Sequence, residues 1–235
     1  MRLVGGQVPQ GPKIILERYS NSRMATTAEA HRKRPRGWYR RAILDAALVE
    51  FNANGVAGAS INAIRQRSGA SVGSIYHHFG DKDGIAGSLY LEGLHDYQQG
   101  FLAALHNSES TRDGIEAGVH HHLGWITRNR ELARFLLLGR DAGVVASTEW
   151  PLRAMNRRFF AEVAEWTRPR MLAGELRELE LDVLTALWIG PSQELARHWL
   201  AGRANRTLAD ATPVLADAAY RSLTTPGDTS NDPDL

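Results

Sequence analysis

A short segment in the first third of the chain carries small and polar residues suited to hydrogen bonding with nucleic acid. Ser71 and Ser74 offer hydroxyls, and Gly73 between them removes a side chain at the point of closest approach. Val72 could contact a thymine methyl group, and His77 could reach a base edge or a phosphate. A helix enters the DNA major groove where its exposed side chains are small and polar, so this segment predicts a recognition helix.

Residues around that segment could bind the DNA backbone. Tyr76, His78 and Lys82 are candidates for phosphate contacts, which position a helix without reading the base sequence. Ser60 precedes another helical pattern, and the start of that helix would present amide groups to a further phosphate. The alternative for Tyr76 and His78 is a packing role in partly buried positions.

Basic residues are concentrated before this region. Residues 1–41 contain ten Lys or Arg against two Glu, so acidic residues outnumber basic ones in the remainder of the chain. A basic arm on an acidic body is typical of a protein that binds a polyanion with one end. Arg40 and Arg41, at the end of this arm, are therefore also candidate DNA contacts. The alternative is a solubilising tail.

The elements that must position these residues are all helical. Apolar residues recur at helical spacing from Gly37 onward, with no alternating strand pattern of useful length, so we predict an all-α fold. Ser60 and Ser71 are expected to cap the second and third helices, and the tight turn around Gly69 makes them a helix-turn-helix. The expected helices span residues 38–53, 61–67, 72–77, 82–106, 111–128, 130–140, 149–168, 180–201 and 210–223, with a short additional one near 170–177.

Three prolines carry positional predictions. Pro169 is expected to interrupt a helix, because proline lacks the amide hydrogen and clashes with the preceding turn. Pro191 lies inside a strongly apolar segment and is expected to kink its helix rather than end it. Thr212 followed by Pro213 has the order of an N-cap and a first helical residue, so it is expected to start the last helix.

Two other patterns could support different chemistry. Residues 69–73 match the G-x-S-x-G pattern of a hydrolase nucleophile elbow, but that elbow needs a strand before the serine, and here a helix is expected. The run His120, His121 and His122 suggests a metal site, yet neighbouring helical residues point about 100° apart and do not converge on one ion. We therefore expect neither an enzyme nor a metal site.

Composition narrows the class of protein further. The 235 residues include no cysteine, which excludes disulfides and thiolate zinc sites and fits a reducing cytosol. No apolar stretch is long enough to span a bilayer, and no signal peptide is evident. The sequence predicts a cytoplasmic protein without a membrane partner and without a cofactor.

The sequence of residues 60–85, SINAIRQRSGASVGSIYHHFGDKDGI, resembles the DNA-binding signature of the TetR family of bacterial repressors. The matching positions are those of the cap, core, turn and contact residues: Ser60, Ile61, Ile64, Gly69, Ser71, Gly73, Ser74, Ile75, Tyr76, His78, Phe79, Lys82 and Ile85. Arg65 and Ala70 depart from the residue types frequent at their positions. The resemblance covers residues 37–90; beyond them, only the helical pattern and the last two helices look similar.

This resemblance implies a ligand-responsive transcriptional repressor that binds operator DNA as a homodimer and is released by a small, largely apolar effector. The implied organisation is a mostly disordered basic arm (1–36), a helix-turn-helix domain (37–83), an effector-binding and dimerisation domain (84–223) and a disordered tail (224–235). The alternative is a regulator of the same fold that activates transcription or has no small-molecule effector.

Aromatic and apolar residues in the later helices supply candidate ligand and dimer sites. The predicted ligand pocket comprises His121, Trp125, Phe135, Phe159 and Trp166, with His122, Arg128 and Arg140 as further polar candidates. The predicted dimer interface comprises Trp188, Leu195, Trp199, Leu215 and Ala218, from two helices that would pair with their symmetry mates. The alternative for both groups is an ordinary place in the hydrophobic core.

Overall fold

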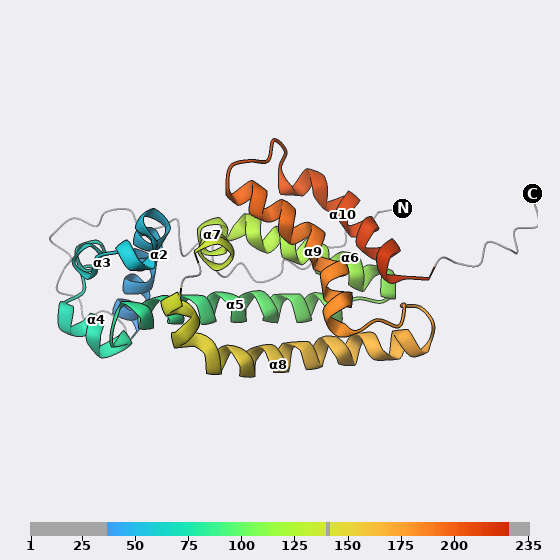
Figure 1. Cartoon of the computed structure of the whole chain (residues 1–235), viewed down its shortest axis with the longest axis horizontal. Coiled ribbons are helices and arrows are strands. Elements are labelled where there is room, and N and C mark those ends of the chain that lie inside the picture. The colour runs from blue at the N-terminus through green and yellow to red at the C-terminus, as the bar shows by residue number, and fades with distance from the viewer. Residues whose placement is uncertain (1–36, 140–141, 226–235) are drawn as a thin grey trace, which may run out of the picture.

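The computed structural model describes residues 37–139 and 142–225, and every regular element in these ranges is an α-helix (Figure 1). The predicted disordered part of the arm (1–36), the tail from residue 226 and Arg140 lie outside the described residues. The all-α prediction is confirmed. The helices are α2 (Trp38–Gly58), α3 (Ile61–Ser68), α4 (Val72–Phe79), α5 (Lys82–His106), α6 (Thr111–Arg128), α7 (Arg130–Leu138), α8 (Ala142–Leu172), α9 (Leu181–Leu200) and α10 (Leu208–Leu223).

Helices α2, α3 and α4 form a small head around one apolar cluster. Leu44 and Leu48 of α2 pack with Ile64 of α3 and with Ile75 and Phe79 of α4, all of them buried. These positions leave the opposite face of each short helix polar. The packing of the three helices in the head therefore depends on about one inward apolar residue per helical turn.

Local signals fix where the helices of the head begin and end. Gly55 interrupts α2 with a left-handed φ of 69°, and Gly69 ends α3 with a φ of 68°, a conformation in which a side chain would be strained. The Ser60 hydroxyl accepts a hydrogen bond from the Ala63 amide at 3.4 Å, and the Ser71 hydroxyl accepts one from Ser74 at 3.1 Å. Both predicted N-caps are confirmed.

Helix α5 runs from the head into the rest of the molecule, which we call the body (α6–α10) (Figure 1). The Asp81 carboxylate caps its start by accepting from the Gly84 amide at 2.7 Å. Helix α8 packs along one side of α5, and α6 packs along another. Because α5 has 25 residues, it extends roughly 37 Å and links both parts mechanically.

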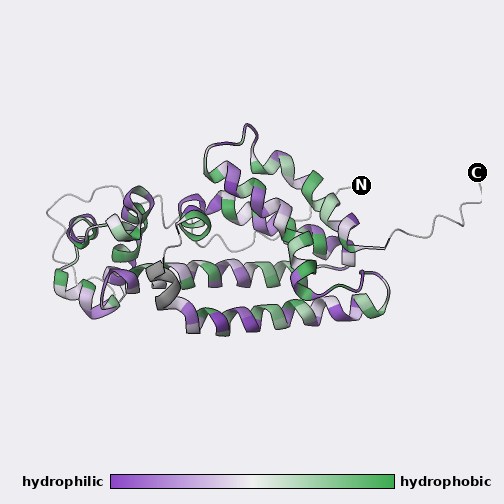
Figure 2. Ribbon diagram, in the orientation of Figure 1, coloured by the Kyte–Doolittle hydropathy of each residue, from purple (hydrophilic) through white to green (hydrophobic). Residues whose placement is uncertain are grey.

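The body buries aromatic side chains between α5, α6, α8 and α9. Trp188 of α9 lies at its centre, 1% exposed, and donates its indole N–H to the Ile115 carbonyl at 2.9 Å. Phe101 and Trp166 contact the same ring, with centroids 5.5 and 5.8 Å away. Hydrophobic and hydrophilic residues are interspersed along each helix of the body (Figure 2).

Two proline predictions were wrong, and one was confirmed in part. Pro213 lies inside α10, which begins five residues earlier, because Thr207 and Asp210 form a reciprocal capping box that starts the helix. Pro169 does not end α8 but lies in its last turns, and a turn takes the place of the short helix expected near 170–177. Pro191 lies within α9 and does not end it, as predicted, and the expected kink stays a prediction.

The other element boundaries lie within two residues of the expectations apart from those of α2, which continues past the expected end at 53 to Gly58, and of α8. This helix begins at Ala142, ahead of the expected start at 149, and includes Pro151 as well as Pro169. Within the described ranges, no helix is both long and apolar enough to cross a bilayer.

Candidate DNA-binding face and ligand cavity

Helix α4 turns Ile75 and Phe79 inward and exposes a mixed face of polar, aromatic and small residues. Val72 is 46% and Tyr76 52% exposed, and Gly73, His77 and His78 are exposed beside them. A Cβ at position 73 would meet nothing closer than the Ser71 hydroxyl at 4.0 Å. The surface at Gly73 is therefore open to a close-approaching partner.

The predicted contact residues of α4 are thus exposed together on one short helix. Ser71 and Ser60 each use their hydroxyl oxygen to cap a helix, which leaves the hydroxyl proton available to an outside acceptor. The first amide groups of α3 and α4 lie next to these caps, and unpaired amides at a helix start attract anions. This arrangement is suited to phosphate oxygens on either side of a groove.

The predicted cations are bound within the protein. Lys82 donates from Nζ to the carbonyl oxygens of Ala57 at 2.6 Å and Ala59 at 3.2 Å, which stabilises the end of α2. Arg40 forms an ion pair with Glu92 of α5 and lies 5.4 Å from the ring centroid of Phe79. Both residues thus stabilise the position of the head. If either of them contacts a phosphate, it does so in addition to this structural role.

The surroundings of Arg41 and Ser71 can be compared with two expectations from the sequence, a DNA contact for Arg41 and a nucleophile elbow at Ser71. Arg41 pairs with Asp45 one turn later on α2, at 2.9 Å. Ser71 follows helix α3 rather than a β-strand, so the strand–turn–helix geometry of a nucleophile elbow does not surround it.

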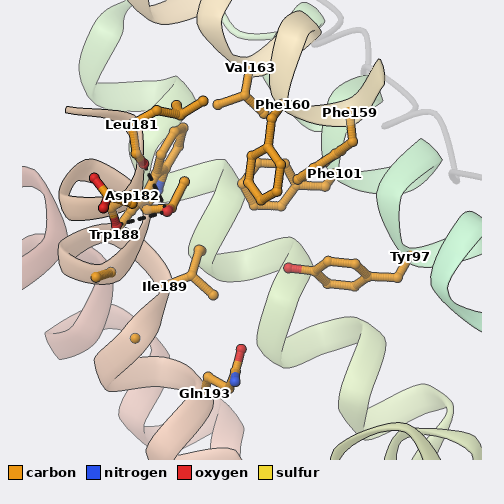
Figure 3. Close-up of a pocket in the computed structure, with 13 residues that line it drawn as sticks. Tyr97, Phe101, Phe159, Phe160, Val163, Leu181, Asp182, Trp188, Ile189 and Gln193 are labelled. Atoms are coloured by element: carbon orange, nitrogen blue, oxygen red, sulfur yellow. Dashed lines mark hydrogen bonds between the residues drawn. The ribbon is translucent and has the colours of Figure 1, made fainter. Parts of the chain in front are cut away.

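A cavity of about 650 Å³ lies in the body, between α5, α8 and α9 (Figure 3). Its volume is in the range of small-molecule sites in proteins. The residues that line it are Tyr97, Phe101, Phe159, Phe160, Val163, Leu181, Asp182, Thr185, Ala186, Trp188, Ile189, Gly190 and Gln193. The cavity is thus walled mainly by apolar side chains and lies away from the head.

Only one of the five predicted pocket residues, Phe159, lines this cavity. Trp166 is buried behind Trp188, and Phe135 stacks on Phe51 of the head at 5.8 Å. Trp125 is buried and donates from its indole to the Asp96 carboxylate at 2.7 Å. The structure uses these aromatic side chains to pack helices together.

Sequence reasoning missed the contribution of α5 to the cavity. Tyr97 and Phe101 lie one turn apart on α5 and face α8 and α9 in Figure 3. Their i, i+4 spacing was a usable signal, but pairing it with residues from α9 requires the tertiary arrangement.

The predicted dimer residues are spread between core and surface. Trp188 is buried and lines the cavity, whereas Leu195 and Leu215 are half-buried against the core. Trp199 is half-buried, and the Arg130 guanidinium lies 4.7 Å from its ring centroid. Ala218 is exposed, as are Val183 on α9 and Val214 on α10, so these two helices do retain apolar surface.

A buried hydrogen-bonded pair lies beside the cavity. The Tyr97 hydroxyl and His122 Nδ1 are 2.9 Å apart, and the neighbouring His121 Nε2 contacts the Tyr97 carbonyl at 2.9 Å. Burial lowers the pKa of His122 to about 3 and that of His121 to about 4, because the charged imidazolium is poorly solvated there. Both rings are therefore neutral at neutral pH. Within the described ranges, no three potential metal-ligating carboxylates or imidazoles converge.

Acidification should destabilise the fold through these histidines. An unfolded histidine takes up a proton below pH about 6.5, whereas the folded rings resist protonation, so the free energy of unfolding falls as the pH falls through this window. For His122 alone the loss is on the order of 2 kcal/mol at pH 5. Urea denaturation from pH 7 to 5 measures it. His122→Gln should reduce the pH dependence, and His120→Gln, at an exposed position, should not; equal slopes in all three proteins would contradict this assignment.

Comparison with known proteins places these features in context. Residues 43–89 match the sequence model of "Bacterial regulatory proteins, tetR family". An HTH-type transcriptional repressor from Mycobacterium tuberculosis is 34% identical over 131 residues, which cover 55% of this chain and 58% of the relative. The HTH-type transcriptional regulator BetI from Paraburkholderia phytofirmans is 37% identical over 57 residues, covering 24% of this chain and 29% of BetI. The matched segment thus spans a little over half the length of the Mycobacterium tuberculosis repressor.

Solved structures share the fold over most of the chain. The transcriptional regulator FadR from Bacillus subtilis, in complex with stearoyl-CoA, superposes with a TM-score of 0.67 at 16% identity, covering 77% of this chain and 97% of FadR. A TetR family transcription regulator from Marinobacter aquaeolei gives 0.65 at 16% identity, covering 80% and 97%. At these identities the likeness concerns the fold alone.

Proposed function

We propose that this chain, which belongs to the tetR family of bacterial regulatory proteins, is a transcriptional repressor that binds operator DNA as a homodimer and is released by a small effector. The observation that carries the proposal is the exposed polar face of α4 around Gly73, on a head whose family match spans residues 43–89. The matched family consists of regulators rather than enzymes, which also argues against hydrolase chemistry at Ser71.

The head would bind DNA with α4 in the major groove. Val72 and His77 would contact base edges, and Ser71 and Ser74 would donate hydroxyl protons to bases or phosphates. Tyr76 and His78 would contact phosphates at the edges of the groove, which fixes the register of the helix. The first amides of α3, next to Ser60, would hold the phosphate across the groove.

A single head of this size reads few base pairs, so two heads would be needed about one DNA turn apart. We propose that α9 and α10 pair with their symmetry mates through apolar surface that includes Val183, Val214 and Ala218. Leu195, Trp199 and Leu215 would lie at the margins of that interface. Trp188 would support it from within the body.

The cavity would couple effector binding to the heads through α5. Tyr97 and Phe101 line the cavity, and the same helix begins at Lys82 against the head. An effector that binds more tightly when α5 is tilted would shift the dimer toward a spacing that does not fit DNA. The size of the effect is limited by the difference between the effector's affinities for the two arrangements.

Titration of the purified chain against its own upstream promoter fragment, with random competitor DNA present, tests the proposal. We expect competitor-resistant binding at two chains per site, and a loss of about tenfold or more in Tyr76→Ala, because each half-site loses a phosphate contact. Lys82→Ala is a poor test, because Lys82 also stabilises the end of α2. Tyr39→Ala, which removes another exposed aromatic residue of the head, is the matched control. Binding that is uniform on all DNA and unchanged in Tyr76→Ala would refute operator recognition by α4.

A further inference from the structure

We propose that the cavity takes an uncharged, largely apolar molecule with one hydroxyl or carbonyl group, and that the Tyr97 hydroxyl is the residue that recognises this group. The inference deepens the proposed function and rests on it for the biological role of the ligand. The binding chemistry itself depends only on the residues around the cavity.

The cavity walls are apolar over most of their area. Phe101, Phe159 and Val163 from α5 and α8 face Trp188 and Ile189 from α9 (Figure 3). Burial of a ligand's hydrocarbon against such walls contributes about 25 cal/mol per Å² of apolar surface removed from water. The walls therefore favour a ligand with a hydrocarbon body, but they do not fix the orientation of that ligand.

Few polar groups reach the cavity, and most of them are already hydrogen-bonded. Thr185 donates its hydroxyl to the carbonyls of Leu181 and Asp182 at 2.9 and 3.0 Å. The Asp182 carboxylate accepts from the Val183 amide at 2.8 Å. The side-chain groups that can still meet a ligand are the Tyr97 hydroxyl, which also bonds His122 and points toward Ile189, the Gln193 amide below it, and the second oxygen of the exposed Asp182 carboxylate (Figure 3).

The 13 lining residues include no Lys, Arg or His, and their one ionisable carboxylate is that of Asp182. A carboxylate or phosphate placed in the cavity would thus lack a cation, and desolvating an unpaired charge is costly. An ammonium group would have only the exposed Asp182 as a partner. Both considerations favour an uncharged polar group.

His122 allows Tyr97 to act as either donor or acceptor. His122 Nε2 is buried and has no hydrogen-bond partner among the described residues, so the neutral ring can carry its proton on either nitrogen. When Nδ1 accepts from Tyr97, the hydroxyl oxygen can accept from a ligand hydroxyl. When Nδ1 donates, the Tyr97 proton can point to a ligand carbonyl. The pair therefore fits alcohols and ketones alike.

A rival ligand class is an amphipathic anion. A second hollow beside the cavity shares Phe160 and Leu181 with it and includes Arg153 and Arg157. Arg153 is already paired with Glu149 at 2.6 Å, which leaves Arg157 as the cation to test. An anion lying across both hollows would depend on Arg157 rather than on Tyr97.

Calorimetric titration near neutral pH with four straight-chain probes of equal length separates these classes: 1-octanol, 2-octanone, octanoate and octylammonium. We expect the alcohol and the ketone to bind at least about tenfold more tightly than either ion. Tyr97→Phe should weaken binding of the alcohol and ketone by about five- to tenfold, because it removes one hydrogen bond. Tyr220→Phe on α10, outside the lining residues, is the matched control and should bind all probes as the parent protein does.

Octanoate binding most tightly, with that preference lost in Arg157→Gln, would overturn the proposal in favour of the amphipathic anion. Binding of none of the four probes would overturn it as well. The ranking of probes by the parent protein decides the ligand class even where Tyr97→Phe is destabilised. Promoter titration of the same preparation tests the proposed DNA binding separately from the proposed ligand class, because the head can bind DNA whatever the cavity accepts.

Discussion

Replacing Gly73 with leucine is expected to lower operator affinity by about 100-fold or more while leaving the folded head intact. A Cβ at position 73 would meet nothing closer than the Ser71 hydroxyl at 4.0 Å, and helix α4 gains rather than loses intrinsic helix propensity when glycine is replaced. On DNA the same side chain would occupy the space where the helix backbone approaches the groove. The loss occurs in both half-sites of a dimer, and a single disturbed base contact costs about 1–3 kcal/mol.

A size series makes this result specific. Gly73→Ala should lose less affinity than Gly73→Leu, and Ala209→Leu, at an exposed position of α10, should bind operator as the parent protein does. Promoter titration with competitor DNA gives the affinities, and thermal unfolding of each variant verifies the fold. Gly73→Leu with unchanged operator affinity would show that α4 does not enter the groove at this point.

The head could be predicted from sequence because its determinants are local. Ser60 and Ser71 cap helices through amides three residues away, and Gly69 supplies the left-handed turn between them. These signals operate within one turn of helix, so their spacing in the sequence is nearly their spacing in space. The same holds for the inward positions of Ile75 and Phe79, which repeat at helical period.

The cavity could not be predicted in the same way, because it depends on contacts between distant segments. Of the aromatic residues proposed from composition, Phe135 reaches the head and Trp166 packs behind Trp188, while only Phe159 faces the cavity. Aromatic content alone does not distinguish a wall of a cavity from the core behind it. Tyr97 joins the site through a hydrogen bond to His122, 25 residues away, and no local pattern reports that contact.

The start of α10 illustrates how two local signals compete. Thr212–Pro213 has the residue order of a helix start, but Thr207 and Asp210 satisfy two terminal amides reciprocally, and the helix begins there instead. Pro213 is then the sixth residue of α10, after Thr212, whose hydroxyl donates to the Leu208 carbonyl at 2.8 Å. The start of α10 is thus decided by a capping box that gives two terminal amides a hydrogen-bond partner. A proline only removes one amide that would need a partner.

Trp188→Ala is expected to reduce the free energy of unfolding by about 3–5 kcal/mol, the range for deleting a large buried aromatic side chain. The indole fills the space between Phe101 and Trp166, and a Cβ on Gly118 would lie only 3.0 Å from it, so little room exists for neighbouring groups to collapse. The substitution also leaves the Ile115 carbonyl without its indole donor.

Urea denaturation at fixed protein concentration measures this effect, because oligomer assembly makes stability depend on concentration. Trp150→Ala is the matched control, since Trp150 is 75% exposed and its removal should change stability by less than about 0.5 kcal/mol. Trp188→Phe should lie between the two, because it retains a ring but not the hydrogen bond. If Trp188→Ala cost no more than Trp150→Ala, the packing of α9 against α5 and α6 would be wrong. The position of Trp188 in the cavity wall, and the ligand chemistry inferred from that wall, would then be refuted as well. The proposed DNA-binding face of α4 would be unaffected.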